Sequence, residues 1–182
     1  PLNLEIGTNL EILDIAIATA PDWVCLVPEN RKERTTEGGL NILDNEILSK
    51  TLFCCEQLKS SLSDVKISLF IESDKDTLNK LHSLKPYIDA VEIHTGEYAK
   101  DFLDGNLTEK FVEDFLNGQE IVKEMNLGYH AGHGLTDLSV GPLLKRQIFE
   151  EYNIGHWIIS QAVFEGLGAV ISKLKNQFES HG

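Results

Sequence analysis

A regular alternation of short apolar runs with longer segments of helical period constrains the fold of this chain more than any other feature. The runs are rich in β-branched residues and short enough to be buried strands. The segments between them carry an apolar residue every three or four positions, as amphipathic helices do. This pattern predicts strands at Leu2–Ile6, Trp23–Val27, Lys66–Ile71, Ala90–His94, Leu127–His130 and Ile154–Ile159. It predicts helices at Asn9–Thr19, Asp44–Leu62, Asp74–Leu84, Thr108–Met125 and Ala162–Phe178.

Repeated strand–helix units are typical of a parallel α/β sheet, either doubly wound or rolled into a (β/α)8 TIM barrel. The sequence holds neither a GxGxxG after its first strand nor a GxxxxGK[ST] loop, which disfavours the nucleotide-binding forms of the sheet. A complete barrel has about 250 residues. If the sheet is a barrel, the 182 residues of this chain would be a single domain over residues 1–182 that covers about six of eight βα units, which would be strands 3 to 8 where the first two units are the missing ones.

The charge balance excludes some classes of partner. Lys and Arg number 16 against 29 Asp and Glu, so the formal net charge is −13. Nucleic acids and anionic membranes bind basic surfaces, and we expect neither as a partner. The acidic net charge does not exclude small anionic substrates, because a few cationic groups or a helix N-terminus make a local positive pocket. The chain has no apolar run of about 18 residues, and its three cysteines, two of them adjacent, are typical of a reduced compartment.

Polar residues fall where the predicted strands end, which is where parallel α/β folds place their active sites. Glu5 and Glu92 lie inside apolar runs. A buried carboxylate is either held in a structural salt bridge or has a shifted pKa and serves as a general acid or base. Four of the six histidines lie in or beside the predicted strands: His94, His130, His133 and His156.

Three further patterns have both a structural and a functional interpretation. The His130-x-x-His133 spacing is short for a metal site, and His133 between two glycines is better interpreted as a proton donor or substrate contact. Gly155 and His156 either pack in the core or hold a phosphate with backbone N–H groups. The charged segment 28–39, which ends in two glycines, is either a solvated loop or a lid over a charged substrate.

Several strings together resemble the pyridoxine 5′-phosphate synthase family over essentially the whole chain. They are CLVPENRKERTTEGGL, ISLFIES, VEIHTGEYA, HAGHGLT and NIGHWIISQAVFEGL. The resemblance implies a (β/α)8 barrel that condenses 1-deoxy-D-xylulose 5-phosphate with 3-amino-2-oxopropyl phosphate. Pyridoxine 5′-phosphate, inorganic phosphate and water would be released in vitamin B6 biosynthesis. It also implies a cytoplasmic homo-octamer that needs no metal and no organic cofactor.

The resemblance also implies roles for particular residues. Glu5 matches the family's catalytic glutamate, and His133 matches its proton-donating histidine. The other matched positions would contact substrate or product. They are Thr35, Gly134, Gly155, His156 and Glu92.

The sequence departs from the family at its start. The family begins with a strand that carries an Asn-x-Asp-His element, followed after its second strand by a basic segment with a catalytic histidine. Neither is present, and the sequence opens at Pro1 without Met. We expect about 65 residues, two βα units of a barrel of about 250, to precede Pro1. An inactive truncated barrel that binds phosphorylated ligands is the alternative, and a different phosphate-binding barrel enzyme would carry other residues at Glu5 or His133.

Overall fold

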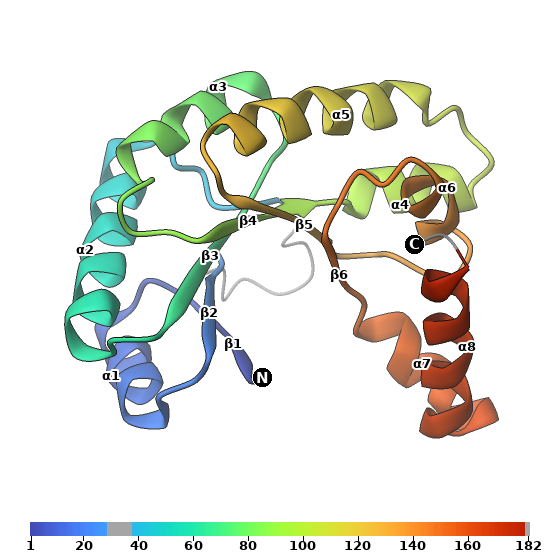
Figure 1. Cartoon of the computed structure of the whole chain (residues 1–182), viewed down its shortest axis with the longest axis horizontal. Coiled ribbons are helices and arrows are strands. Elements are labelled where there is room, and N and C mark those ends of the chain that lie inside the picture. The colour runs from blue at the N-terminus through green and yellow to red at the C-terminus, as the bar shows by residue number, and fades with distance from the viewer. Residues whose placement is uncertain (29–37, 181–182) are drawn as a thin grey trace.

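The protein, described here from a computed structural model over residues 1–28 and 38–180, is built on one six-stranded sheet. The strand order follows the chain, and every neighbouring pair is parallel. The sheet curls into an arc (Figure 1), which confirms the predicted partial (β/α)8 barrel. Its strands are β1 (Asn3–Ile6), β2 (Trp23–Leu26), β3 (Lys66–Ile71), β4 (Ala90–His94), β5 (Gly128–Gly132) and β6 (Glu151–Asn153).

Helices alternate with the strands, and α1, α2, α3 and α5 cover the outer, convex side of the arc (Figure 1). Within the described residues, no helix combines the length and the apolar character needed to cross a membrane. The helices are α1 (Leu10–Thr19), α2 (Asn45–Ser61), α3 (Lys75–Lys80), α4 (Gly96–Leu103), α5 (Glu109–Glu124), α6 (Val140–Lys145), α7 (His156–Glu165) and α8 (Leu167–Glu179), with a 3-10 turn η1 (Leu81–Ser83).

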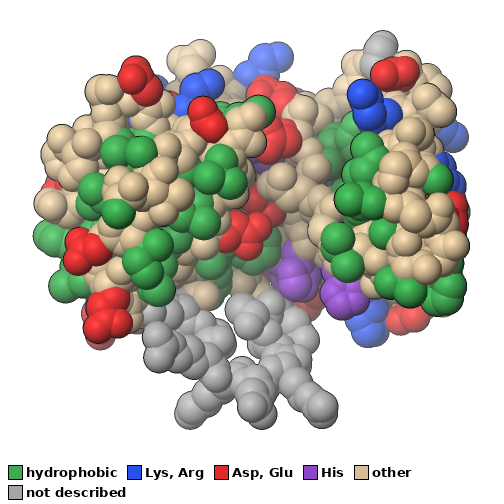
Figure 2. Space-filling view, turned by 90° about the horizontal axis from the view of Figure 1, so that it is seen from below, with side chains coloured by type: hydrophobic (Ala, Val, Ile, Leu, Met, Phe, Trp, Pro, Cys, Tyr) green, Lys and Arg blue, Asp and Glu red, His purple; other side chains and the backbone are tan. Residues whose placement is uncertain are grey.

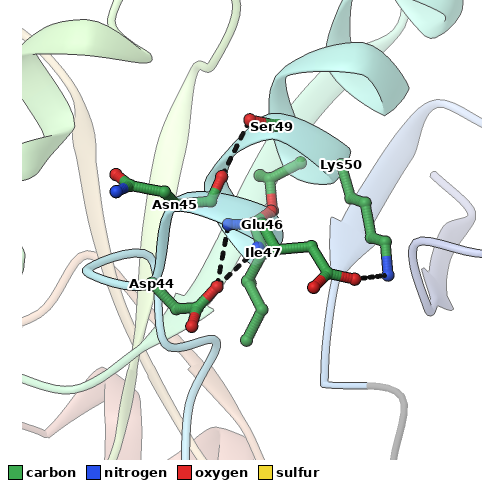
Figure 3. A network of polar contacts seen from close by, with 7 residues as sticks. Asp44, Asn45, Glu46, Ile47, Ser49 and Lys50 are labelled. Carbon is green, nitrogen blue, oxygen red and sulfur yellow. Dashed lines mark hydrogen bonds and ion pairs between the residues drawn. The ribbon is translucent and has the colours of Figure 1, made fainter.

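Acidic or amide side chains start the early helices by capping their first N–H groups. The Asp44 carboxylate accepts hydrogen bonds from the backbone N–H groups of Glu46 at 2.8 Å and Ile47 at 3.1 Å, and so begins α2 (Figure 3). Glu46 in turn pairs with Lys50 one turn later, at 2.7 Å. Asp74 and Asn9 cap α3 and α1 in the same way. Such caps satisfy donors that the helix itself cannot pair, and each is worth about 1 kcal/mol.

The two faces of the sheet differ in chemistry because side chains alternate along each strand. On β3, Ile67, Leu69 and Ile71 belong to the apolar core beneath the helices. Ser68 and Phe70 alternate with them and face the inside of the arc. The same alternation turns a mostly polar set inward from all six strands: Asn3, Glu5, Cys25, Ser68, Phe70, Glu92, His94, His130, Asn153. The arc therefore has an apolar outside and a polar inside.

Two expectations near the C-terminus are wrong. The predicted strand at Ile154–Ile159 is instead the entry to α7, and the last strand is the shorter β6. The predicted helix at Ala162–Phe178 is two helices, α7 and α8, separated by Gly166 at a φ of 81°. Glycine takes this left-handed conformation without steric cost, so it ends one helix and starts the next. The short helices α4 and α6 were not predicted, and the predicted lid falls largely on residues 29–37, outside the described ranges.

Candidate active site

A cleft of about 850 Å³ lies inside the arc, at the carboxyl ends of the strands. It is lined by Glu5 from β1, Glu92 from β4, the His133–Gly134 turn after β5, and the Gly155–His156 start of α7. Figure 2 looks toward the hollow between the two ends of the arc, where acidic and histidine side chains gather. The structure thus places six of the seven proposed site residues around one space, and Thr35 lies outside the described residues.

Glu92 is the most buried polar group of the cleft, at 5% exposed. The Asn153 amide donates a hydrogen bond to Glu92 Oε2 at 2.7 Å, and the buried Cys25 thiol donates to the same oxygen at 3.7 Å. Burial raises the pKa of Glu92 to about 7, Asn153 acts in the opposite direction, and the charge of Glu5 raises the pKa further. A carboxyl group that titrates near neutral pH can both give and take a proton during turnover.

The position of Glu92 depends on a glycine in the neighbouring strand. Gly132 lies in β5, and a Cβ atom at Gly132 would overlap Glu92 Oε1. The strand β5 therefore has glycine at position 132, where the Glu92 carboxyl group lies directly against its backbone.

Glu5 also faces the cleft, but its exposure differs from the expectation of a buried carboxylate. Its side chain is exposed because β1 is an edge strand of the described sheet, with β2 as its single neighbour. Glu5 and Glu92 therefore present two carboxyl groups in different surroundings, one in contact with solvent and one buried.

His133 is held in an unusual backbone conformation at the mouth of the cleft. Its φ is 77°, in the left-handed region that a non-glycine residue rarely adopts, and Gly134 follows with a φ of 76°. The Thr95 hydroxyl donates hydrogen bonds to the carbonyl oxygens of Gly132 at 2.8 Å and His133 at 2.9 Å, and so holds this turn. Strain of this kind persists only where the surroundings impose it, and it concentrates at functional sites.

The N-terminus of α7 opens into the same cleft. Gly155 is the residue before the first turn, His156 begins the helix, and no side chain caps it. A Cβ atom at Gly155 would meet no other atom of the described residues within 4 Å, so the space beside Gly155 is open. Free N–H groups and the helix dipole make such an end a binding site for anions.

His130 lies on the inner face of the arc but does not line the cleft. Its ring is 5.8 Å from that of Trp23. Burial lowers its pKa, against the opposing charges of Glu151 and Glu150. Within residues 1–28 and 38–180, no three His, Cys, Asp or Glu side chains are grouped to hold a metal ion. Nor does any Lys or Arg of the described residues line the cleft.

Sequence reasoning missed two side chains around the site. Cys25 contacts Glu92, and Glu72, which follows β3, pairs with His94 at 3.0 Å. Alternation along β2 was a signal for Cys25, because Val24 and Leu26 are the apolar outward pair. Glu72 gave a weaker signal, since only the adjacency of β3 and β4 brings it to His94.

A parallel βα arc with carboxyl and imidazole groups collected at its carboxyl edge defines an enzyme of the barrel class, built for acid–base chemistry. Comparison with known proteins gives the particular family. Residues 1–180 match the family described as "Pyridoxal phosphate biosynthesis protein PdxJ". The chain belongs to this family, and is thus an enzyme of vitamin B6 biosynthesis.

Individual relatives agree with this assignment. A pyridoxine 5′-phosphate synthase of Ehrlichia chaffeensis is 37% identical over 180 residues, covering 99% of this chain and 71% of the relative. Those of a Wolbachia species and a Sulfurihydrogenibium species are both 39% identical, over 96% of this chain and 70% and 69% of theirs. GMP reductase from Trypanosoma brucei shares the fold alone, with a TM-score of 0.65 and 12% identity over 97% of this chain and 40% of its own.

Proposed function

We propose that this protein condenses 1-deoxy-D-xylulose 5-phosphate with 3-amino-2-oxopropyl phosphate to form pyridoxine 5′-phosphate, inorganic phosphate and water. The observation that carries the proposal is the shared cleft, which joins two carboxyl groups, an imidazole and an open helix N-terminus. Both substrates are phosphate esters with a carbonyl group, so the site needs anion binding beside proton transfer. Membership of the PdxJ family and the names of the relatives support the same reaction.

Each residue has a proposed task in this reaction. Imine formation, loss of phosphate, dehydration and ring closure all move protons at carbonyl and enamine carbons. Glu5 accepts a proton, and His133 donates one from the mouth of the cleft. Glu92 lies buried between strands and contacts the reacting molecule with a proton that it holds near neutral pH.

The substrate-binding tasks fall to the remaining residues. Gly155 and His156 hold a substrate phosphate against the first turn of α7. Gly134 gives the product access to the His133 turn, and Thr35 contacts the deoxyxylulose phosphate. From the resemblance we also propose a cytoplasmic homo-octamer without metal or organic cofactor. Light scattering on the purified protein tests its mass in solution.

The proposed reaction is tested by incubating the protein with both substrates and following pyridoxine 5′-phosphate by mass spectrometry and released phosphate by colorimetry. Replacement His133→Asn should lower turnover by about 10²–10⁴-fold, the usual contribution of a general acid. His82→Asn is the matched control, because His82 is an exposed histidine in η1, and should leave turnover unchanged. Turnover of His133→Asn within about threefold of the unchanged protein would remove His133 from the chemistry.

A second function, phosphate-ligand binding without catalysis, is favoured by one observation. The N-terminus of α7 has no side-chain cap, and it can hold a phosphate whether or not proton transfer follows. The same incubation distinguishes the two functions. Product formation supports the synthase, whereas saturable binding of pyridoxine 5′-phosphate with no product supports the binding protein.

A further inference from the structure

A hydrogen-bonded pair of side chains, the buried His94 and the half-exposed Glu72, lies beside His133. The His94 side chain is 3% exposed, and its Nδ1 lies 3.0 Å from Glu72 Oε1. The rings of His94 and His133 meet edge to face, with centroids 5.0 Å apart and an interplanar angle of 61°. Phe70 closes the cluster from β3, at 5.4 Å from His94 and 6.2 Å from His133. The His133 ring thus rests on a side chain that is itself fixed by a carboxyl group.

Both rings pack against a glycine at the start of α4. Gly96 begins α4, and a Cβ atom there would lie 2.6 Å from His94 Nε2 and 2.8 Å from His133 Cδ2. Both distances are too short for a real side chain, so this position needs glycine for the two rings to pack as they do. His94 Nε2 is buried at this place and has no hydrogen-bond partner among the described residues.

Glu72 holds its charge in this environment and thereby fixes the proton on His94. Burial acts to raise the pKa of Glu72, but hydrogen bonds from His94 and from the backbone N–H of Gly39, the latter at 2.8 Å, outweigh burial and lower the pKa. A carboxylate accepts and does not donate, so His94 Nδ1 carries the proton of this hydrogen bond. The other nitrogen, Nε2, is left toward the start of α4 and the His133 ring.

We propose that Glu72 and His94 form a positioning pair that fixes the ring of His133 for proton donation into the cleft. This inference rests on the proposed role of His133. The carboxylate orients His94, and the edge-to-face contact transmits that orientation to His133. A base or acid oriented by a third group is a recurring arrangement in proton-transfer sites. Neither residue of the pair lines the cleft, so we assign it an effect through His133, which does.

A carboxylate lies on the far side of His94 from His133. Among residues 1–28 and 38–180, the titratable groups around His133 include His94 and Glu72 on one side, and Glu5, Glu92 and His156, which line the same cleft. Glu72 does not line the cleft, and its contact with the His133 ring runs through His94.

The first test is spectroscopic and needs no substrate. In the 15N-histidine-labelled chain, long-range 1H–15N correlations should show His94 with its proton on Nδ1. Glu72→Gln should redistribute that proton and move the ring signals of His133. The signals of His82, in η1, should stay in place. Unmoved His133 signals in Glu72→Gln, or a proton on Nε2 of His94 in the unchanged chain, would overturn the positioning pair.

The second test separates positioning from binding. In the product-forming assay, Glu72→Gln should lower kcat by about tenfold while KM changes by less than about twofold, since the pair does not line the cleft. Glu72→Asp should restore part of kcat because it keeps the charge. Glu97→Gln, an exposed change in the first turn of α4, is the matched control. A full kcat in Glu72→Gln would refute the inference. Absence of product in the unchanged protein would refute the proposed function and leave the spectroscopic result to decide the pair.

Discussion

Among the carboxyl groups that line the cleft, Glu92 has the most strongly shifted pKa, and its surroundings explain the shift. Its only donors in the described structure are the Asn153 amide and the Cys25 thiol. Burial also raises the pKa of Cys25 well above its ordinary value, so this neighbour stays a neutral thiol. Two neutral donors compensate a buried charge poorly, and the protonated form of Glu92 is favoured.

The stability of the protein should therefore depend on the proton of Glu92. The pKa of Glu92 in the fold, about 7, lies above its ordinary value of 4.5. Below pH 4.5 Glu92 is neutral and its burial does not destabilise the protein. As the pH rises through 7 the buried group ionises, and the protein loses stability. Glu92→Gln cannot ionise, and relative to the unchanged protein it should gain about 2–3 kcal/mol in unfolding free energy between pH 4.5 and pH 8. Urea unfolding at both pH values measures this. The same difference in unfolding free energy between the two proteins at both pH values would show that Glu92 is not a buried carboxyl group that titrates in this range.

Gly132 is the residue that makes room for Glu92. Gly132→Ala adds a Cβ atom onto Glu92 Oε1, so the carboxyl group must leave its place beside Asn153. We expect a loss of about 1–3 kcal/mol in stability from overpacking and at least a tenfold fall in product formation. Gly168→Ala in α8, where a Cβ atom meets nothing within 4 Å, is the matched control. Normal product formation by Gly132→Ala would show that Glu92 has no part in the chemistry.

Sequence patterns identified side chains that lie at strand ends and missed those that depend on pairing. Glu92 and His133 stood out because they interrupt apolar runs or follow them. The exposure of Glu5 was not predictable from its apolar neighbours, because it follows from the position of β1 at the sheet edge. Glu72 had no local signal, since its partner His94 lies 22 residues away on the next strand.

Among the elements, long helices and apolar strands were predictable and the segment around β6 was not. β6 has three residues, two of them polar, and is held as a strand by its pairing with β5. The apolar run after it, Ile154–Ile159, satisfies the pattern of a buried strand as well as that of a helix. The structure resolves the ambiguity as α7, which begins at His156 rather than near Ala162. This correction moves Gly155 and His156 onto the helix N-terminus itself.

The open N-terminus of α7 leads to a prediction about anion binding. Gly155→Val should weaken binding of inorganic phosphate by at least tenfold, because the side chain fills the open space beside Gly155 at the uncapped first turn. The variant should stay folded, since a Cβ atom there meets no other atom of the described residues within 4 Å. Gly168→Val, near the start of α8, is the control for a valine at a helix start. Calorimetry measures the affinity, and unchanged affinity in Gly155→Val would show that α7 does not hold the phosphate.

The whole molecule follows from one repeated unit. Because each βα unit packs beside the previous one, the strands pair in chain order and the sheet curls with its helices outside. The cadence of the sequence was sufficient to predict this arc, as it depends on local patterns repeated along the chain. The arrangement of the cleft was less predictable, because its residues come from β1, β4, β5 and α7 together.

The net charge of the chain adds a constraint that no single residue shows. A protein at −13 repels a phosphate dianion at long range, while the N-terminus of α7 attracts it only at close range. Raising KCl from about 20 to 200 mM shortens the Debye length to below about 10 Å and screens the long-range repulsion first. Calorimetry at pH 8 should therefore show phosphate binding that tightens by about two- to threefold. Pyridoxine, which lacks the phosphate, should be insensitive to salt. Phosphate affinity that falls with salt would mean instead that direct contacts with cationic side chains dominate the site.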